Sequence, residues 1–189
     1  IEFTIPGSYD NIQAGMDSSI VWDTILVATG TYNGTTNFGG KKIILKCQGQ
    51  SRDCILNGNN AATVIEFSGD EDTNTILDGF TITGGNSFYT YGECEPGCGG
   101  GIAAVWSADF YVDSLILKDM VFINNDIDIN LGHSGGTFTE ISNSTFICEN
   151  SWPTIFSTSS DHLEIKNCIY YGEGYLVSNY ENESSISYS

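Results

Sequence analysis

Residues 117–122 (LKDMVF) share their pattern with residues 141–146 (ISNSTF) and 165–170 (IKNCIY). Each copy reads apolar, polar, Asp or Asn, variable, β-forming, apolar, and the copies start at 117, 141 and 165, a constant step of 24 residues. A fourth copy at 77–82 (LDGFTI) starts 40 residues before 117, which is one step of 24 plus an insertion of 16. The third position always holds Gly, Asp or Asn, residues that tolerate the left-handed backbone of a sharp bend. A repeat of this period predicts a solenoid.

A second kind of short β-forming run lies between the copies, and we call these runs the leading strands. They occupy residues 64–67, 102–105, 127–131, 154–156 and 175–177. Each period therefore holds three short strands and three turns. This organisation predicts an all-β fold, a right-handed parallel β-helix of about six coils that stack about 4.8 Å apart.

The whole chain, residues 1–189, is predicted to be one β-helix domain. Residues 1–22 would form an N-terminal cap with a short helix, in which Ile12 and Met16 share one face. Residues 23–180 would form the coils, with 23–32 as the first leading strand and 42–46 and 54–58 completing that coil. Residues 181–189 would begin an incomplete coil, which predicts truncation of a longer chain or an end covered by a second copy.

The sequence resembles pectin-lyase-like right-handed β-helix proteins at 12–14 (IQA), 23–27 (DTILV), 30–32 (GTY), 77–85 (LDGFTITGG) and 99–102 (GGGI). That group includes polysaccharide lyases, glycoside hydrolases, pectin esterases, phage tailspikes, adhesins and bacterial surface proteins. The resemblance implies the fold across nearly the whole chain, but the group shares no single function. It also implies that a substrate would bind on the leading-strand face or in the groove beside it.

Charge excludes several classes of partner. The chain carries 24 acidic and 6 basic residues, a net charge of −18. Nucleic acids and anionic membrane surfaces require a basic face, so neither is expected as a partner. No run approaches 18 apolar residues, so no membrane insertion is expected. Six cysteines in an acidic chain favour an oxidising, extracellular or cell-surface location.

Two acidic residues are candidate catalytic groups. Glu66 and Asp128 are predicted to point outward from leading strands two coils apart, about 9–10 Å, at the upper edge of the spacing of an inverting glycosidase pair. The intermediate coil offers Ala103 where enzymes of this fold concentrate acids. The resemblance implies that esterases of this group pair Asp residues with an arginine. The single arginine here, Arg52, lies in a different loop.

Acidic side chains also form two candidate calcium sites, because hard oxygen ligands suit Ca²⁺. One comprises Asp70 and Asp72 on a turn, and the other comprises Asp126 and Asp128 on a strand. No other cofactor is expected.

The insertion at 86–98 is the most site-like segment, because long loops on a repeat scaffold often hold the function. Tyr89 and Tyr91 in this loop, together with Trp106 and Trp152, are candidate ligand-binding residues, since aromatic rings pack on sugars or on a protein partner. Packing of these rings back onto the solenoid is the alternative.

Four cysteines are candidates for short-range disulfides. Cys94 and Cys98 could pair within the insertion, and Cys47 and Cys54 could close the loop 48–53. Cys148 and Cys168 do not fit as a pair, because the repeat places them about 13 Å apart along the strand direction.

Basic residues gather in one outward column of the repeat, formed by Lys46, Asp78, Lys118, Ser142 and Lys166. A polyanion-facing stripe or a lyase-type base is one interpretation, and a surface ladder with interleaved charges is the other.

The main functional interpretation is a non-catalytic extracellular or cell-surface module that binds a glycan or a surface protein or forms part of a surface assembly. The weak catalytic constellation and the acidic surface favour it. One alternative is a polysaccharide-active hydrolase or lyase that uses outward acids on the leading-strand face. Another is a structural filament subunit that self-associates end to end through exposed strand edges.

Overall fold

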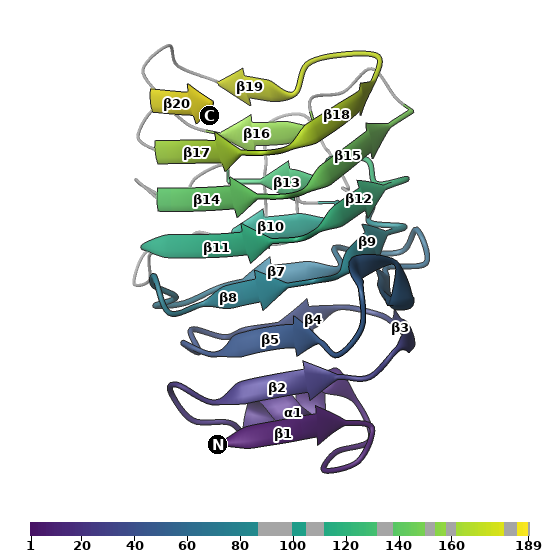
Figure 1. The fold of residues 1–189 in the computed structure, drawn as a ribbon, viewed down its shortest axis with the longest axis vertical. Coiled ribbons are helices and arrows are strands. Elements are labelled where there is room, and N and C mark those ends of the chain that lie inside the picture. The colour runs from purple at the N-terminus through teal and green to yellow at the C-terminus, as the bar shows by residue number, and fades with distance from the viewer. Residues whose placement is uncertain are drawn as a thin grey trace.

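In a computed structural model the chain winds into a right-handed parallel β-helix, with three sheets running along the axis from the N-terminal to the C-terminal end (Figure 1). The structure describes residues 1–86, 100–104, 112–131, 138–149, 154–157, 162–179 and 185–188. Each coil passes through sheets A, B and C in turn. The predicted fold class is confirmed. Among the described helices, none has the length and hydropathy needed to cross a bilayer.

Every strand pairs in parallel with its equivalents in the neighbouring coils. Sheet A contains β1 (Glu2–Ile5), β2 (Thr24–Val27), β5 (Ile44–Cys47), β8 (Ile76–Asp78), β11 (Ser114–Lys118), β14 (Phe138–Ser142), β17 (His162–Lys166) and β20 (Ser185–Tyr188). Sheet B contains β3 (Gly30–Asn33), β6 (Cys54–Asn57), β9 (Thr81–Thr83), β12 (Val121–Ile123), β15 (Thr145–Cys148) and β18 (Ile169–Gly172). Sheet C contains β4 (Thr36–Asn37), β7 (Ile65–Phe67), β10 (Ile102–Ala104), β13 (Ile129–Asn130), β16 (Ile155–Ser157) and β19 (Val177–Asn179).

The core consists of inward side chains that stack from coil to coil. In sheet A the paired positions form an aliphatic ladder of Ile25, Leu45, Leu77, Leu117, Ile141 and Ile165. In sheet B, Phe122 and Phe146 are both fully buried, with ring centroids 5.0 Å apart and an interplanar angle of 4°. Stacking identical apolar positions removes them from water in every coil, which is the main stabilising contribution to such a fold.

The bend from sheet A to sheet B has the left-handed backbone that the repeat predicts. The residues at the third position have positive φ: 84° for Gly79, 53° for Asp119, 52° for Asn143 and 50° for Asn167. The backbone N–H groups of Gly79, Asp119 and Asn143 continue the inter-coil ladder, as in the bond from Asn143 to the Lys166 carbonyl at 3.0 Å. This conformation explains why Gly, Asn or Asp recurs there.

The short helix α1 (Ile12–Ser18) packs beside the first coil, as predicted, and Ile12 and Met16 are buried. The Asn11 side chain caps its N-terminus by accepting the Ala14 N–H at 2.8 Å. At the C-terminal end, the Lys41 ammonium donates to the carbonyls of Met16 and Asp17 at 2.6 and 2.7 Å. A cation there complements the helix dipole.

The first coil differs from the prediction. Residues 23–32 do not form one leading strand: they contain β2 in sheet A and β3 in sheet B, joined by a short bend. The strand of this coil that belongs to sheet C is β4, which has only two residues and was not predicted. Residues 2–5 also form a strand, β1, at the edge of sheet A.

Candidate functional site

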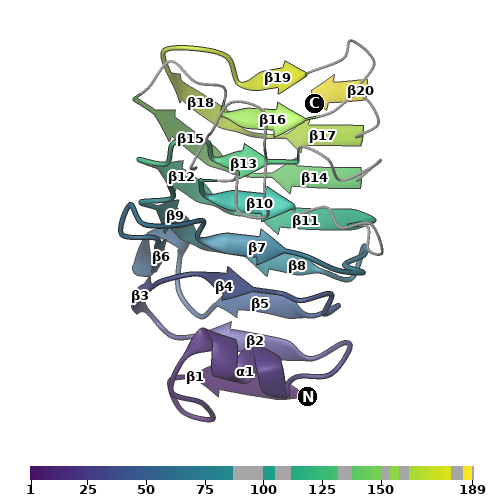
Figure 2. The same ribbon diagram turned by 180° about the vertical axis from the view of Figure 1, so that it is seen from behind.

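The outer face of sheet C corresponds to the predicted leading-strand face, and Figure 2 shows its strands from the front. Strand pairing aligns one outward residue from each coil: Asn37, Glu66, Ala103, Asn130, Phe156 and Ser178. Their neighbours in the strands, such as Ile65 and Ile102, point into the core and are fully buried. Among these outward strand positions, Glu66 is the only ionisable side chain that the structure describes.

Glu66 occupies a half-buried setting between two neutral neighbours. Its Oε2 accepts a hydrogen bond from Asn37 Nδ2 at 3.1 Å, and Ala103 lies on its other side in the row. Burial raises the pKa of the Glu66 carboxyl above its usual range, while the hydrogen bond from Asn37 opposes part of that rise. A carboxyl group in this state can give or take a proton closer to neutral pH than an exposed one can.

Asp128 does not lie in the paired row of Glu66, so the strand register does not give the spacing expected for a Glu66–Asp128 pair, and the catalytic role of Asp128 stays a prediction. Asn130, not Asp128, aligns with Glu66 across Ala103. Asp128 lies at the corner between sheets B and C and is only 3% exposed. The corner interrupts the strict alternation on which the prediction depended.

Within the corner, Asp128 has one polar partner among the described residues. Asn125 Nδ2 donates to its Oδ1 at 2.9 Å, whereas its Oδ2 has no hydrogen-bond partner in the described part of the chain. Burial raises the pKa of Asp128 to about 7, and the Asn125 bond opposes that shift. Asp128 is therefore a buried acid whose proton is held up to near-neutral pH.

The same corner holds both stems of the predicted insertion. Asn125 Oδ1 accepts the Gly85 N–H at 2.9 Å, and the Gly101 N–H bonds to the Ile127 carbonyl at 2.8 Å. Gly85 and Gly100 approach so closely that a Cβ on Gly85 would lie 2.0 Å from the Gly100 carbonyl oxygen. The glycines at the stems are therefore required by close backbone contact. The insertion candidates Tyr89, Tyr91, Cys94 and Cys98, and also Trp106 and Trp152, lie outside the described residues.

The acidic candidates for calcium lie in different surroundings. Asp70 and Asp126 are exposed, and Asp72 pairs with Lys42 Nζ at 3.2 Å. Glu71, between Asp70 and Asp72, is fully buried and accepts three backbone N–H bonds, so it shapes the turn. The described residues contain no group of three or more His, Cys, Asp or Glu side chains placed to hold a metal ion.

The predicted lysine column is confirmed on sheet A by the pairing of β5, β8, β11, β14 and β17. Lys46 Nζ contacts Asp78 Oδ2 at 2.6 Å, and Lys166 Nζ contacts Glu164 Oε2 at 3.0 Å. Hydrogen bonding to Asp78 raises the pKa of Lys46, which is the opposite of what a lyase-type base needs. The column is therefore a surface ladder of mixed charge.

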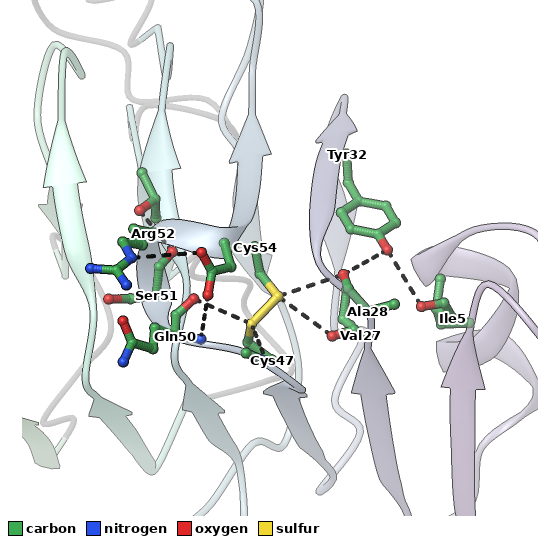
Figure 3. Close-up of a disulfide and its surroundings, with 12 residues drawn as sticks. Ile5, Val27, Ala28, Tyr32, Cys47, Gln50, Ser51, Arg52 and Cys54 are labelled. Carbon is green, nitrogen blue, oxygen red and sulfur yellow. Dashed lines mark hydrogen bonds and ion pairs between the residues drawn. A yellow bond between two sulfur atoms is a disulfide. The ribbon is translucent and has the colours of Figure 1, made fainter.

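The predicted Cys47–Cys54 disulfide is present and closes the loop that contains the 3₁₀ helix η1 (Ser51–Asp53) (Figure 3). Arg52 lies in this loop, where it contacts Asp53. The loop connects β5 of sheet A to β6 of sheet B, so it is not part of sheet C. Cys148 and Cys168 do not form a disulfide with each other, in agreement with the spacing of the repeat.

Together these observations define a right-handed parallel β-helix in which Glu66 is the half-buried acid among the described outward residues of sheet C. Solved structures of similar fold include the rice weevil pectin methylesterase (TM-score 0.54, 12% identity, 99% of this chain and 64% of that one). Carrot pectin methylesterase matches with a TM-score of 0.52 at 10% identity, covering 100% of this chain and 63% of that one. The Aspergillus niger enzyme matches with a TM-score of 0.51 at 14% identity, covering 99% and 66%. The chain thus spans a little under two thirds of the weevil and carrot enzymes. No family model and no curated protein sequence matches it.

The comparison corrects the main functional interpretation. The expected non-catalytic surface module is contradicted, because these structural neighbours are all enzymes named for acting on pectin. The finding favours the alternative, a polysaccharide-active enzyme. At these identities the likeness itself establishes the fold, so the chemistry must be argued from the residues of this chain.

Two residues of the site were not found from the sequence. Asn37 precedes Glu66 by 29 residues and belongs to a two-residue strand, and Gln13 contacts Asn37 from α1. The spacing of 29 departs from the 24-residue step, so the repeat did not align them. An extended Thr-Asn pair after the glycine at position 34 was the only local signal.

Proposed function

We propose that this chain is a secreted or cell-surface polysaccharide-active hydrolase in which Glu66 transfers a proton to or from the substrate. The observation that carries the proposal is the half-buried Glu66 carboxyl, held by Asn37 on the outer face of sheet C. General acid–base catalysis requires a positioned group whose pKa approaches the working pH, and typically contributes 10²–10⁴-fold to the rate. The polysaccharide-active enzymes among the structural neighbours support the substrate class.

The distribution of cations favours an uncharged or esterified polysaccharide as the substrate. All six basic residues of the chain have described positions: Lys41, Lys42, Lys46, Arg52, Lys118 and Lys166. Lys41 binds the end of α1, Lys42 pairs with Asp72, and the others lie on sheet A or in the loop after it. None of them belongs to a sheet C strand. The strands that flank Glu66 would therefore offer a free uronate carboxylate no Lys or Arg partner, and a net charge of −18 would repel a polyanion.

The test is a panel of neutral glycans, methyl-esterified pectin and de-esterified pectin, incubated with the purified chain. Reducing ends report glycosidic cleavage, and released methanol or acid reports ester cleavage. We expect products from neutral or esterified members, loss of product with Glu66→Gln, and retention with Glu140→Asn or Glu140→Gln. Glu140 is a matched control because it is also a half-buried carboxylate, on the outer face of sheet A, where it pairs with Lys166.

Each result bears directly on the proposal. Full activity of Glu66→Gln, or no product from any member of the panel, would overturn it. Parallel incubations with calcium and with EDTA test the calcium hypothesis separately. Equal rates in both would remove calcium from the account without affecting Glu66.

A further inference from the structure

Asn37 lies in β4, the edge strand of sheet C, which pairs with β7 on one side and with no described strand on the other. On the open side, the side-chain amide of Gln13 takes the place of a neighbouring strand. Gln13 Nε2 donates to the Asn37 carbonyl at 3.1 Å, and the Asn37 N–H donates to Gln13 Oε1 at 2.9 Å. This two-bond contact satisfies backbone groups that an edge strand otherwise leaves unpaired.

The Asn37 side chain is held in one orientation by its own partners. Its Oδ1 accepts the Gly39 N–H at 2.7 Å and the Ser68 hydroxyl at 2.9 Å. Because the oxygen is engaged by these two donors, the Nδ2 group faces Glu66 and donates to Oε2 at 3.1 Å. A reversed amide would place an oxygen against the carboxylate and a donor against the Gly39 N–H.

We infer that Asn37 is the positioning residue of Glu66, and that Gln13 acts through Asn37, so that helix α1 is a working part of the site. The contacts themselves are independent of the reaction. Only their consequence for catalysis rests on the proposed function. The alternative is that Gln13 merely closes the edge of the sheet and leaves the behaviour of Glu66 unchanged.

The described groups that flank the Asn37–Glu66 pair, directly or through one hydrogen-bonded residue, come from three elements, and none of the charged ones forms an ion pair with Glu66. Helix α1 contributes Asp17, whose carboxylate accepts from Gln13 Nε2 at 2.9 Å, and Lys41 lies at the end of that helix. The turn after β7 contributes Glu71, which accepts the Ser68 N–H at 3.1 Å. Strand β10 contributes the neutral Ala103. The direct hydrogen bond from Asn37 is thus the principal interaction that favours the charged form of Glu66, while burial disfavours it.

Carboxyl-detected NMR titration of Glu66 in the full chain tests this inference without any substrate. Asn37→Ala removes the donor and is expected to raise the Glu66 titration midpoint by about one pH unit, the lower end for a hydrogen bond to a charged group. Asn57→Ala is the matched control. Asn57 also points outward from a strand, but it contacts Asn59 on sheet B and is expected to leave Glu66 unchanged.

Gln13→Ala tests whether Gln13 influences Glu66 through Asn37, which we call the relay, or only closes the edge of the sheet. It also keeps the inference testable if Asn37→Ala does not fold. We expect Gln13→Ala to raise the midpoint by less than Asn37→Ala, and to add no shift in the Asn37→Ala background. A Glu66 midpoint that stays the same in Asn37→Ala, or in Gln13→Ala where that is the only folded variant, would overturn the inference. An equal Gln13→Ala shift in both backgrounds would overturn the relay.

Activity supplies a separate readout once a substrate is known. In Asn37→Ala, the limb of the pH–rate profile that reports Glu66 should move to higher pH by the shift seen in the titration. Absence of turnover on every substrate would refute the proposed function, while the titration would still decide whether Asn37 positions Glu66.

Discussion

Replacement of Asp128 by Asn should remove a pH-dependent cost of folding. The pKa of this buried carboxyl rises from 3.8 to about 7 in the folded chain, a shift of about 3 units. Because the folded pKa is the higher one, the folded state retains its proton over a range in which the unfolded chain has lost it. The free energy of unfolding is therefore not reduced by this group below about pH 4, and it falls progressively as the pH rises to 7. At about 1.4 kcal/mol per unit, the loss above pH 7 is on the order of 4 kcal/mol.

An amide at position 128 stays neutral at every pH and keeps an acceptor oxygen for Asn125. We therefore expect Asp128→Asn to unfold in urea at nearly the same midpoint as the wild type at pH 4, and at a clearly higher midpoint at pH 8. Asp126→Asn, an exposed position two residues away, is the control and should show no such gain. Parallel pH dependence of the wild type and Asp128→Asn between pH 4 and pH 8 would refute the reasoning.

Three further predictions concern the scaffold. Phe122→Ala removes one ring of the stacked pair with Phe146 and should lower the free energy of unfolding by about 3–5 kcal/mol, measured by urea denaturation; a loss under about 1 kcal/mol would contradict the core assignment. Replacing both Cys47 and Cys54 by Ser opens a loop with a sequence separation of 7 and should cost about 2–3 kcal/mol by the same assay, whereas an unchanged midpoint would show that the bridge does not contribute. Asn143→Ala should cost about 1 kcal/mol because φ is 52°, while Asn143→Gly should be nearly neutral; equal stability of the two variants in thermal melts would count against the left-handed bend.

The repeat made the fold predictable because its physical cause is local. One position per coil requires a left-handed residue, and Asp119, Asn143 and Asn167 mark it at a constant spacing. The flanking apolar positions then fall into the core ladders. Sequence could therefore give the fold class, the coil number, the capping helix and the Cys47–Cys54 bridge.

The candidate site was only half predictable. Glu66 was proposed from the sequence because it points outward from a leading strand, but its partner Asn37 lies in a strand too short to show alternation. The register of Asp128 was not predictable because a period of two holds only within a strand, and Asp128 lies in the corner just before β13, in a run of buried residues from 127 to 131. Long-range hydrogen bonds such as Gln13 to Asn37 have no local signal in a sequence.

The central claim is that Glu66 transfers a proton in a hydrolytic site on sheet C. The most direct measurement is kcat/KM for the wild type, Glu66→Gln and Glu140→Gln on the best substrate of the panel, with folding of each variant verified by circular dichroism. The account predicts a loss of at least about 100-fold for Glu66→Gln and a value near that of the wild type for Glu140→Gln. A folded Glu66→Gln variant with the wild-type value would contradict the claim.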